Sequence, residues 1–128
     1  MADEVTVTLS VDLKNPSTGA VGALKDSFAT GAIKFTQATA GAFSRVVATS
    51  TTDTALTLSG ITSPGWVMFQ NLDPTNAIKI GPESSGAIVA MIQLPPKGVA
   101  VLPAFASVTF RHQSTAGTPR LLVKVLEA

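Results

Sequence analysis

The sequence predicts an all-β protein: a single domain over residues 1–128 that folds as an antiparallel, jelly-roll-like β-sandwich. Short segments rich in apolar residues recur about nine or ten times along the chain, and in many of them apolar and polar residues alternate. Clusters of Gly, Pro, Asn and Ser separate these runs at intervals of roughly 8 to 12 residues, as in β-sandwiches. A small closed barrel is the alternative. At 128 residues the chain can bury a core without disulfides or metal.

The stretch Gly65–Gly81 anchors this prediction, because it holds the only Trp and two apolar runs on either side of a polar turn. Such a pattern is typical of a β-hairpin. In the first run, Trp66–Phe69, both alternating faces are apolar, as in a strand that is covered on both sides. We therefore expect this hairpin to be the central core ribbon of the sandwich, with Trp66 in the core.

The clearest strand is Val5–Leu13, in which five apolar residues alternate with Thr, Ser and Asp. Ala20–Lys25 has no clear period and is expected to be a loop. Gly81–Gly86 is expected to be a flexible polar loop, and Pro95–Gly98 a bend, because proline donates no backbone hydrogen bond. The other expected strands are, in chain order, Ile33–Thr36, Phe43–Thr49, Leu56–Ser59, Trp66–Phe69, Ile78–Ile80, Ile88–Leu94, Val99–Leu102, Val108–Arg111 and Leu121–Leu126.

The composition argues against nucleic acids and membranes as partners of this protein. Charged residues make up 13% of the chain and the net charge is +1, so the basic field that nucleic-acid binding requires is missing. No apolar run reaches membrane length, and the acidic start Met1–Glu4 is unlike a signal peptide, so we expect no membrane span and no export. A weakly charged surface rich in small residues favours packing into an assembly. An ordinary soluble β-domain is the plain alternative.

No group of residues predicts catalysis, a metal site or a cofactor site. The chain has no Cys, and His112 is its only histidine, so a Ser-His-Asp relay would depend on this residue. A solvated or interface histidine beside Arg111 is the better interpretation. Asp73 and Glu83 could form a carboxylate pair, or bind calcium together with Asp53, yet neither spacing matches such a site. Asp73 is expected to cap a turn.

Two further features have both a functional and a structural interpretation. Gly81 and Gly86 are not followed by the Gly-Lys-Ser/Thr sequence of a phosphate loop, and they are expected to be loop hinges. Trp66 could stack on a sugar, but its place inside an apolar run favours the core. A carbohydrate-binding β-sandwich module is therefore kept as an alternative function, and so is an enzyme that depends on His112.

The C-terminal half carries several motifs in a fixed order. Gly65–Asn76 contains a Gly-aromatic strand and an Asn-Leu-Asp-Pro-Thr-Asn turn, Ile80–Pro82 an Ile-Gly-Pro loop, and Lys97–Leu102 a Lys-Gly-led strand. In these motifs the chain resembles a group of small structural proteins encoded by tailed bacteriophages. The resemblance covers roughly the C-terminal half of the chain.

The resemblance implies a structural virion protein, most specifically a capsid decoration (cement) protein that binds the shell as a homo-oligomer and stabilises it. Its expected partners are the major capsid protein or other virion proteins. Its expected location is the virion, which is assembled in the host cytoplasm. A head-to-tail or tail structural protein is the alternative within the same class. Neither enzyme activity nor a cofactor nor a metal is expected.

The N-terminal segment is the expected contact with other subunits. Residues 1–31 are expected to form an extended arm, whose apolar strand adds to the sheet edge of another chain. The loops around residues 19–31 are expected to share this role. The expected interface residues are the apolar positions of the strand, Val5, Val7, Leu9, Val11 and Leu13.

Overall fold

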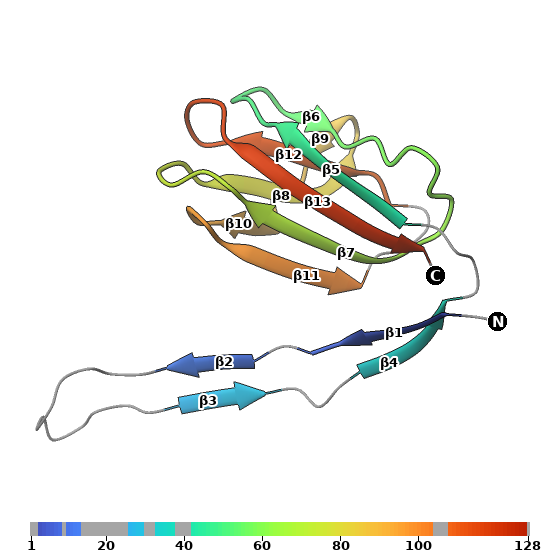
Figure 1. The fold of residues 1–128 in the computed structure, drawn as a ribbon. Coiled ribbons are helices and arrows are strands. Elements are labelled where there is room, and N and C mark those ends of the chain that lie inside the picture. The colour runs from blue at the N-terminus through green and yellow to red at the C-terminus, as the bar shows by residue number, and fades with distance from the viewer. Residues whose placement is uncertain are drawn as a thin grey trace, which may run out of the picture. The chain divides into compact units, whose positions relative to one another are not determined.

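The computed structural model describes residues 3–8, 10–13, 26–29, 33–37, 42–103 and 108–127. It divides the chain into two compact units, Met1–Gln37 and Ala38–Ala128. Every regular element in the described part is a β-strand, and all strand pairs are antiparallel (Figure 1). Accordingly, none of the described residues forms a helix that could span a membrane. The predicted class, an antiparallel β-sandwich, is confirmed.

Thirteen strands are described. They are β1 (Asp3–Val7), β2 (Ser10–Leu13), β3 (Asp26–Ala29), β4 (Ile33–Gln37), β5 (Ala42–Ala48), β6 (Thr54–Ala55), β7 (Pro64–Asn71), β8 (Ile78–Ser84), β9 (Ala87–Ile88), β10 (Ile92–Leu94), β11 (Val99–Pro103), β12 (Phe110–Ser114) and β13 (Arg120–Glu127).

The N-terminal unit consists of paired strands: β1 with β4, and β2 with β3. The predicted strand Val5–Leu13 is present as two strands, β1 and β2, and the strand predicted at Ile33–Thr36 is confirmed as β4. Strand β3 was not expected, because its sequence Asp-Ser-Phe-Ala has one large apolar residue and no visible alternation. The loop predicted at Ala20–Lys25 and the arm boundary at residue 31 lie outside the described residues.

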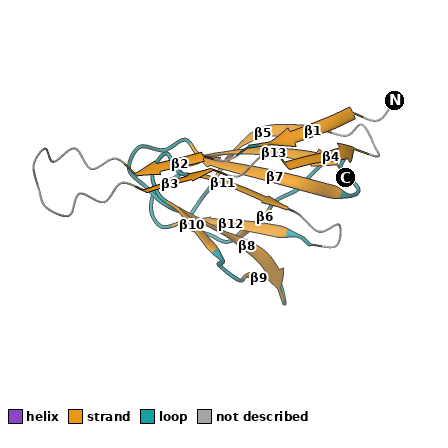
Figure 2. Ribbon diagram, turned by 90° about the horizontal axis from the view of Figure 1, so that it is seen from below, coloured by secondary structure: helices purple, strands orange, loops and turns teal. Residues whose placement is uncertain are grey.

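The C-terminal unit is a sandwich of two sheets. One sheet has the strand order β11-β7-β13-β5, and the other has the order β10-β8-β12-β6, with β9 paired to β8. Figure 2 views these two layers nearly edge-on. Strand β13 pairs with β7 on one side and with β5 on the other, so its eight residues join most of the first sheet.

The core lies between the two sheets and follows the alternation of the strands. In β13, Leu121, Val123 and Val125 are fully buried, as their alternation predicts. The rings of Phe69 in one sheet and Phe110 in the other meet edge to face, with centroids 5.6 Å apart. The buried core residues are Leu56, Val67, Phe69, Ile78, Ile80, Leu94, Phe110, Leu121, Val123 and Val125.

The stretch Gly65–Gly81 is not a hairpin, and this prediction is wrong. Strand β7 pairs with β11 and β13, whereas β8 pairs with β10 and β12 in the opposite sheet. The connection between β7 and β8 therefore crosses from one layer to the other. Sheets in a sandwich lie about 10 Å apart, which six residues span easily. The predicted central position of β7 holds, because it lies between β11 and β13.

Two other local predictions are also wrong. Leu56–Ser59 is not a strand: β6 ends at Ala55, and Leu56 is held instead by its amide, which donates to the Phe110 carbonyl at 2.8 Å. Gly81–Gly86 is not a flexible loop, because β8 runs through to Ser84 and turns into β9. The expected strand Ile88–Leu94 is divided into β9 and β10.

Candidate interaction surface

The outer side of the sheet β11-β7-β13-β5 is the most distinctive surface of the described residues. Because Val67 and Phe69 of β7 point into the core, Trp66 and Met68 lie on the opposite side of the strand. The register extends this side across all four strands in three rows. The rows, which together we name the apolar face, are Pro103-Trp66-Leu126-Ala42, Val101-Met68-Lys124-Ser44 and Val99-Gln70-Leu122-Val46.

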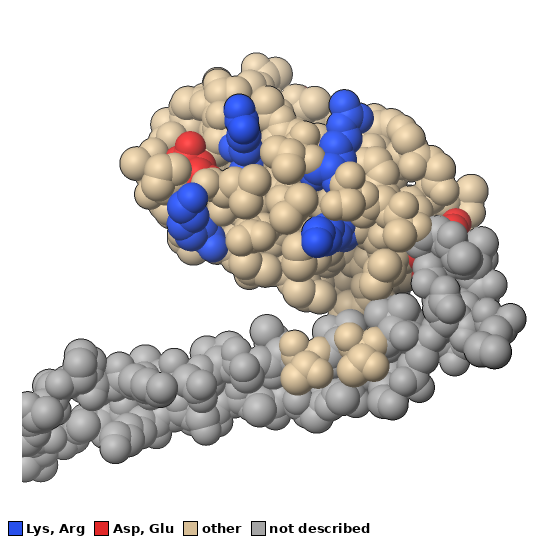
Figure 3. Space-filling view, in the orientation of Figure 1, with Lys and Arg blue, Asp and Glu red and all other residues tan. Residues whose placement is uncertain are grey.

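Large apolar side chains of the apolar face are open to solvent in this single chain. Val46, Val99 and Val101 are 47%, 54% and 38% exposed, and Trp66 and Met68 are half-buried. Lys124 is the one charged residue of the three rows. Figure 3 shows this side of the molecule, where a few blue cations interrupt a surface that is otherwise largely tan. Apolar patches of this kind on a protein surface commonly mark binding sites.

Trp66 is therefore not a core residue, and the predicted cover on both sides of Trp66–Phe69 is wrong. Only the Val67 and Phe69 side of β7 packs into the sandwich core. The sequence did hold a signal for the face, because in all four strands of this sheet, β5, β7, β11 and β13, both alternating sets contain large apolar residues. From the sequence alone, a strand that is apolar on both faces is expected to be buried on both faces.

The strands of the opposite sheet carry polar residues on their outer side, although Val89 and Met91, in the segment between β9 and β10, are exposed apolar residues. Register places Gln93 and Gln113 on either side of Lys79, and Arg111 lies next along β12. Arg111 joins two carboxylates: its Nε lies 2.7 Å from Asp53 Oδ1, and its Nη1 lies 2.7 Å from Glu83 Oε2. The two outer surfaces of the sandwich thus differ sharply in chemistry.

Asp53 connects Arg111 of β12 with the backbone of β9. Its Oδ2 accepts a hydrogen bond from the Ile88 amide at 2.7 Å, in addition to its contact with Arg111. Burial raises the pKa of the Asp53 carboxyl, but the bonds from Arg111 and Ile88 outweigh that effect and hold the pKa below its usual value. The network contains one guanidinium and two carboxylates, so its net charge is −1.

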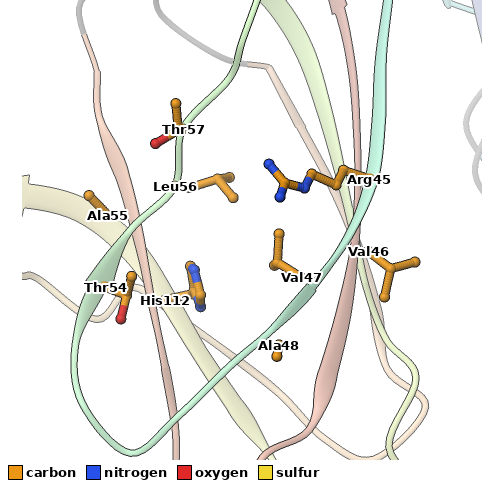
Figure 4. A pocket seen from close by; sticks show the side chains of 9 residues that line it. All are labelled: Arg45, Val46, Val47, Ala48, Thr54, Ala55, Leu56, Thr57 and His112. Carbon is orange, nitrogen blue, oxygen red and sulfur yellow. The ribbon is translucent and has the colours of Figure 1, made fainter.

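His112 is buried, and the predicted solvated or interface histidine is wrong. It is 4% exposed, and its Nδ1 lies 3.1 Å from the Thr49 hydroxyl. His112 lines a cavity of about 300 Å³ together with residues of β5 and of the segment around Leu56. In Figure 4 its ring lies near Thr54, and Arg45 lies on the opposite side of the group. Burial lowers the pKa of His112; Asp53 opposes this shift and Arg111 adds to it.

A second cavity lies at the other edge of the sandwich, between β11 and the β8–β10 side. Its volume is about 400 Å³, and its lining is almost wholly apolar, with Met91 and Leu102 on facing elements. Such a lining can accept an apolar group but provides no chemistry for a reaction.

The acidic residues considered for catalysis or calcium serve other contacts. Asp73 caps its own turn, as predicted: its Oδ1 accepts from the amides of Thr75 at 2.7 Å and Asn76 at 2.6 Å. Glu83 and Asp53 both form ion pairs with the Arg111 guanidinium. Within the described residues no group of three or more His, Cys, Asp or Glu side chains could hold a metal ion.

The glycines of the predicted hinge have distinct roles. Gly81 is buried in β8, where an added Cβ would lie 1.8 Å from the Val89 carbonyl oxygen, so the chains approach too closely for a side chain. Gly86 has a φ of +78° in the β8–β9 turn, a conformation that favours glycine. The hinge interpretation is wrong for Gly81, because its lack of a side chain allows β8 and the Val89 backbone to approach closely.

Four of the predicted interface residues lie in described strands. Val5 and Val7 belong to β1, and Val11 and Leu13 belong to β2, whereas Leu9 lies outside the described residues. Their strands are occupied on one edge by β4 and β3. Their role in an interface stays a prediction.

The chain was compared with known proteins, and no protein-family model, curated protein or solved structure matches it.

Proposed function

We propose that this protein is a structural component of a bacteriophage particle, a decoration protein that binds the assembled shell and stabilises it. The observation that carries the proposal is the contrast between the two outer surfaces of the sandwich. The apolar face presents Trp66, Met68 and the exposed valines, while the other sheet presents Lys79, Arg111 and glutamines. The phage-like motifs between Gly65 and Leu102 give the class of partner.

The size of the apolar face indicates how such binding would work. Four strands spaced about 4.8 Å apart give a face that is roughly 15 Å wide. A face of this width offers less area than each partner buries in a standard protein–protein interface. A single contact is therefore expected to be weak. On a shell that repeats the same site many times, an oligomer that engages several sites at once would bind far more tightly than one copy.

A carbohydrate-binding module is the second candidate, because Trp66 lies half-buried on an outer surface. Its neighbours in the row are Pro103 and Leu126, however, and neither side chain offers a hydrogen-bond donor or acceptor to a sugar. Titration of the protein with glycans, followed by Trp66 fluorescence, separates the two candidates. A saturable spectral shift would support the carbohydrate module, and we expect none.

Reconstitution tests the decoration function. Purified protein is added to phage shells that lack it, and the bound copies per shell and the heat resistance of the shells are measured. We expect saturable binding and a higher temperature of shell disruption. Binding to tails and not to shells would overturn the proposal in favour of a tail role.

A matched pair of variants connects the binding to the apolar face. Val101→Glu places a charge on the apolar face, and Gln93→Glu places the same charge on the polar side of the other sheet. Both residues are exposed, so neither change should unfold the protein. We expect the Val101 variant to bind shells at least tenfold more weakly and the Gln93 variant to bind normally. Equal binding by both would contradict the assignment of the face.

A further inference from the structure

The sheet of the apolar face ends at β5, and the side of β5 away from β13 is a long strand edge. Within the described residues β5 pairs with β13 along all seven residues, Ala42–Ala48, and with no other strand. The edge strands of the opposite sheet are shorter, with three residues in β10 and two in β6. Short edges hinder pairing with another chain, whereas a long edge permits it.

The register shows which backbone groups of β5 face this edge. The amide of Thr49, the residue after β5, donates to the Pro119 carbonyl at 2.8 Å. Hydrogen-bonded positions alternate in an antiparallel pair, so Val47 and Arg45 also bond toward β13. The intervening residues direct their N–H and C=O groups away from β13. These residues are Ala42, Ser44, Val46 and Ala48.

Arg45 gives the edge a chemical preference. Its side chain points into the cavity beside Leu56, while Val46 points away from it (Figure 4). Arg45 forms no ion pair with any described residue. An inward-pointing charge on an edge strand discourages pairing with a neutral strand. It would favour a strand that brings a carboxylate.

The N-terminal unit has the features of such a strand. Neither of its strand pairs, β1 with β4 or β2 with β3, is joined by a third strand within the described residues. A two-stranded ribbon is only marginally stable by itself, so it gains from further pairing. Residues 1–37 contain four of the chain's eight Asp and Glu residues but three of its nine Lys and Arg residues, so the formal net charge is −1 for this unit and +2 for the rest of the chain.

We propose that the N-terminal arm of one copy adds strand β1 to the β5 edge of a second copy, with Asp3 or Glu4 beside Arg45. The contact would consist of backbone hydrogen bonds and one ion pair. Each copy donates an arm and receives one, so the contact closes either as a reciprocal dimer or as a head-to-tail ring. The edge uses backbone groups of β5, and the side chains of its residues Ala42, Ser44 and Val46 belong to the apolar face. The inference does not depend on shell binding.

Proline at an edge-facing position tests the backbone contact. Ser44→Pro removes an N–H that points to the edge and leaves the bonds to β13 intact, and Ser44→Ala is the matched control. The mass of the full chain is measured by sedimentation over a wide range of concentration. We expect oligomers for wild type and Ser44→Ala, and monomers for Ser44→Pro. A wild type that stays monomeric, or a proline variant that assembles normally, would overturn the proposal.

Charge reversal tests the ion pair. We expect Arg45→Glu to weaken association at least tenfold, and Asp3→Lys with Glu4→Lys to restore it when combined with Arg45→Glu. Lys124→Glu, on the apolar face, should assemble like wild type, which distinguishes this edge from the shell-binding face. Failure of the combined variant to recover association would overturn the pairing of β1 with Arg45.

Discussion

Asn71 shows how one buried side chain can hold a connection between two sheets. It is fully buried at the end of β7, and its Nδ2 donates to the carbonyls of Asn76 at 2.8 Å and Pro95 at 3.0 Å. Its Oδ1 accepts from the Asp73 amide at 3.0 Å. The same side chain therefore joins the β7–β8 connection to the bend that precedes β11.

We expect Asn71→Asp to lower the free energy of unfolding by about 3 kcal/mol, because a carboxylate would face two carbonyl oxygens in a buried site. Asn76→Asp is the matched control, since the Asn76 amide donates to the exposed Thr75 hydroxyl. Urea denaturation of both variants measures the difference. Similar losses for the two variants would show that the Asn71 hydrogen bonds do not hold the connection.

His112 should make stability depend on pH. Burial lowers its pKa in the folded protein below the unfolded value of about 6.5. The unfolded state therefore binds more protons, and the free energy of unfolding falls as the pH drops below about 6.5. We expect His112→Gln to remove this decline, whereas carboxylates contribute only near pH 4 and below. Parallel pH profiles for variant and wild type, from thermal denaturation, would contradict this account of His112.

At the scale of single elements, the same local pattern can serve two different connections. Two apolar runs around Asn71–Ala77 predict a hairpin, yet the turn instead carries the chain from one sheet to the other. The choice depends on which strands are available as neighbours, and β13 and β12 lie far along the sequence. Alternation, in contrast, is a local property. It predicted β13 closely, and it predicted strand structure at Val5–Leu13, which is present as two strands, β1 and β2.

The surface was harder to predict than the strands. Alternation along Leu121–Leu126 places Leu122 and Leu126 on one side of the strand, but this side becomes part of a patch only when β7 pairs with β13 and β11 pairs with β7. Burial of His112 was likewise hidden, because its strand neighbours Arg111 and Gln113 are polar and indicate solvent. Both features come from tertiary pairing and not from local propensity.

Gly81 tests the close approach of β8 to the segment before β10. We expect Gly81→Ala to destabilise the protein by roughly 3 kcal/mol or more, because its Cβ would overlap the Val89 carbonyl. Gly86→Ala meets no atom within 4 Å and should cost about 1 kcal/mol through its positive φ. Thermal denaturation compares the two variants. An equal cost at both sites would show that the β8 backbone can move away from Val89.

At the scale of the whole molecule, the two units suggest a division of tasks. The sandwich of the C-terminal unit provides a surface with one apolar and one mainly polar side, and the N-terminal unit, Met1–Gln37, provides strands and a formal net charge of −1. In our proposals the apolar face binds the shell, and the arm joins copies to one another. Weak individual contacts would then act together on a repeating surface.

Thiol protection on the shell is the most direct test of the central claim that the apolar face binds. The chain has no Cys, so Val101→Cys and Gln93→Cys each introduce a single thiol, one on the apolar face and one on the polar side. Each variant is treated with a maleimide reagent, free and bound to shells. We expect the thiol of Val101→Cys to be protected by shell binding and that of Gln93→Cys to react as in the free protein. Protection of the Gln93→Cys thiol and not of the Val101→Cys thiol would contradict the account.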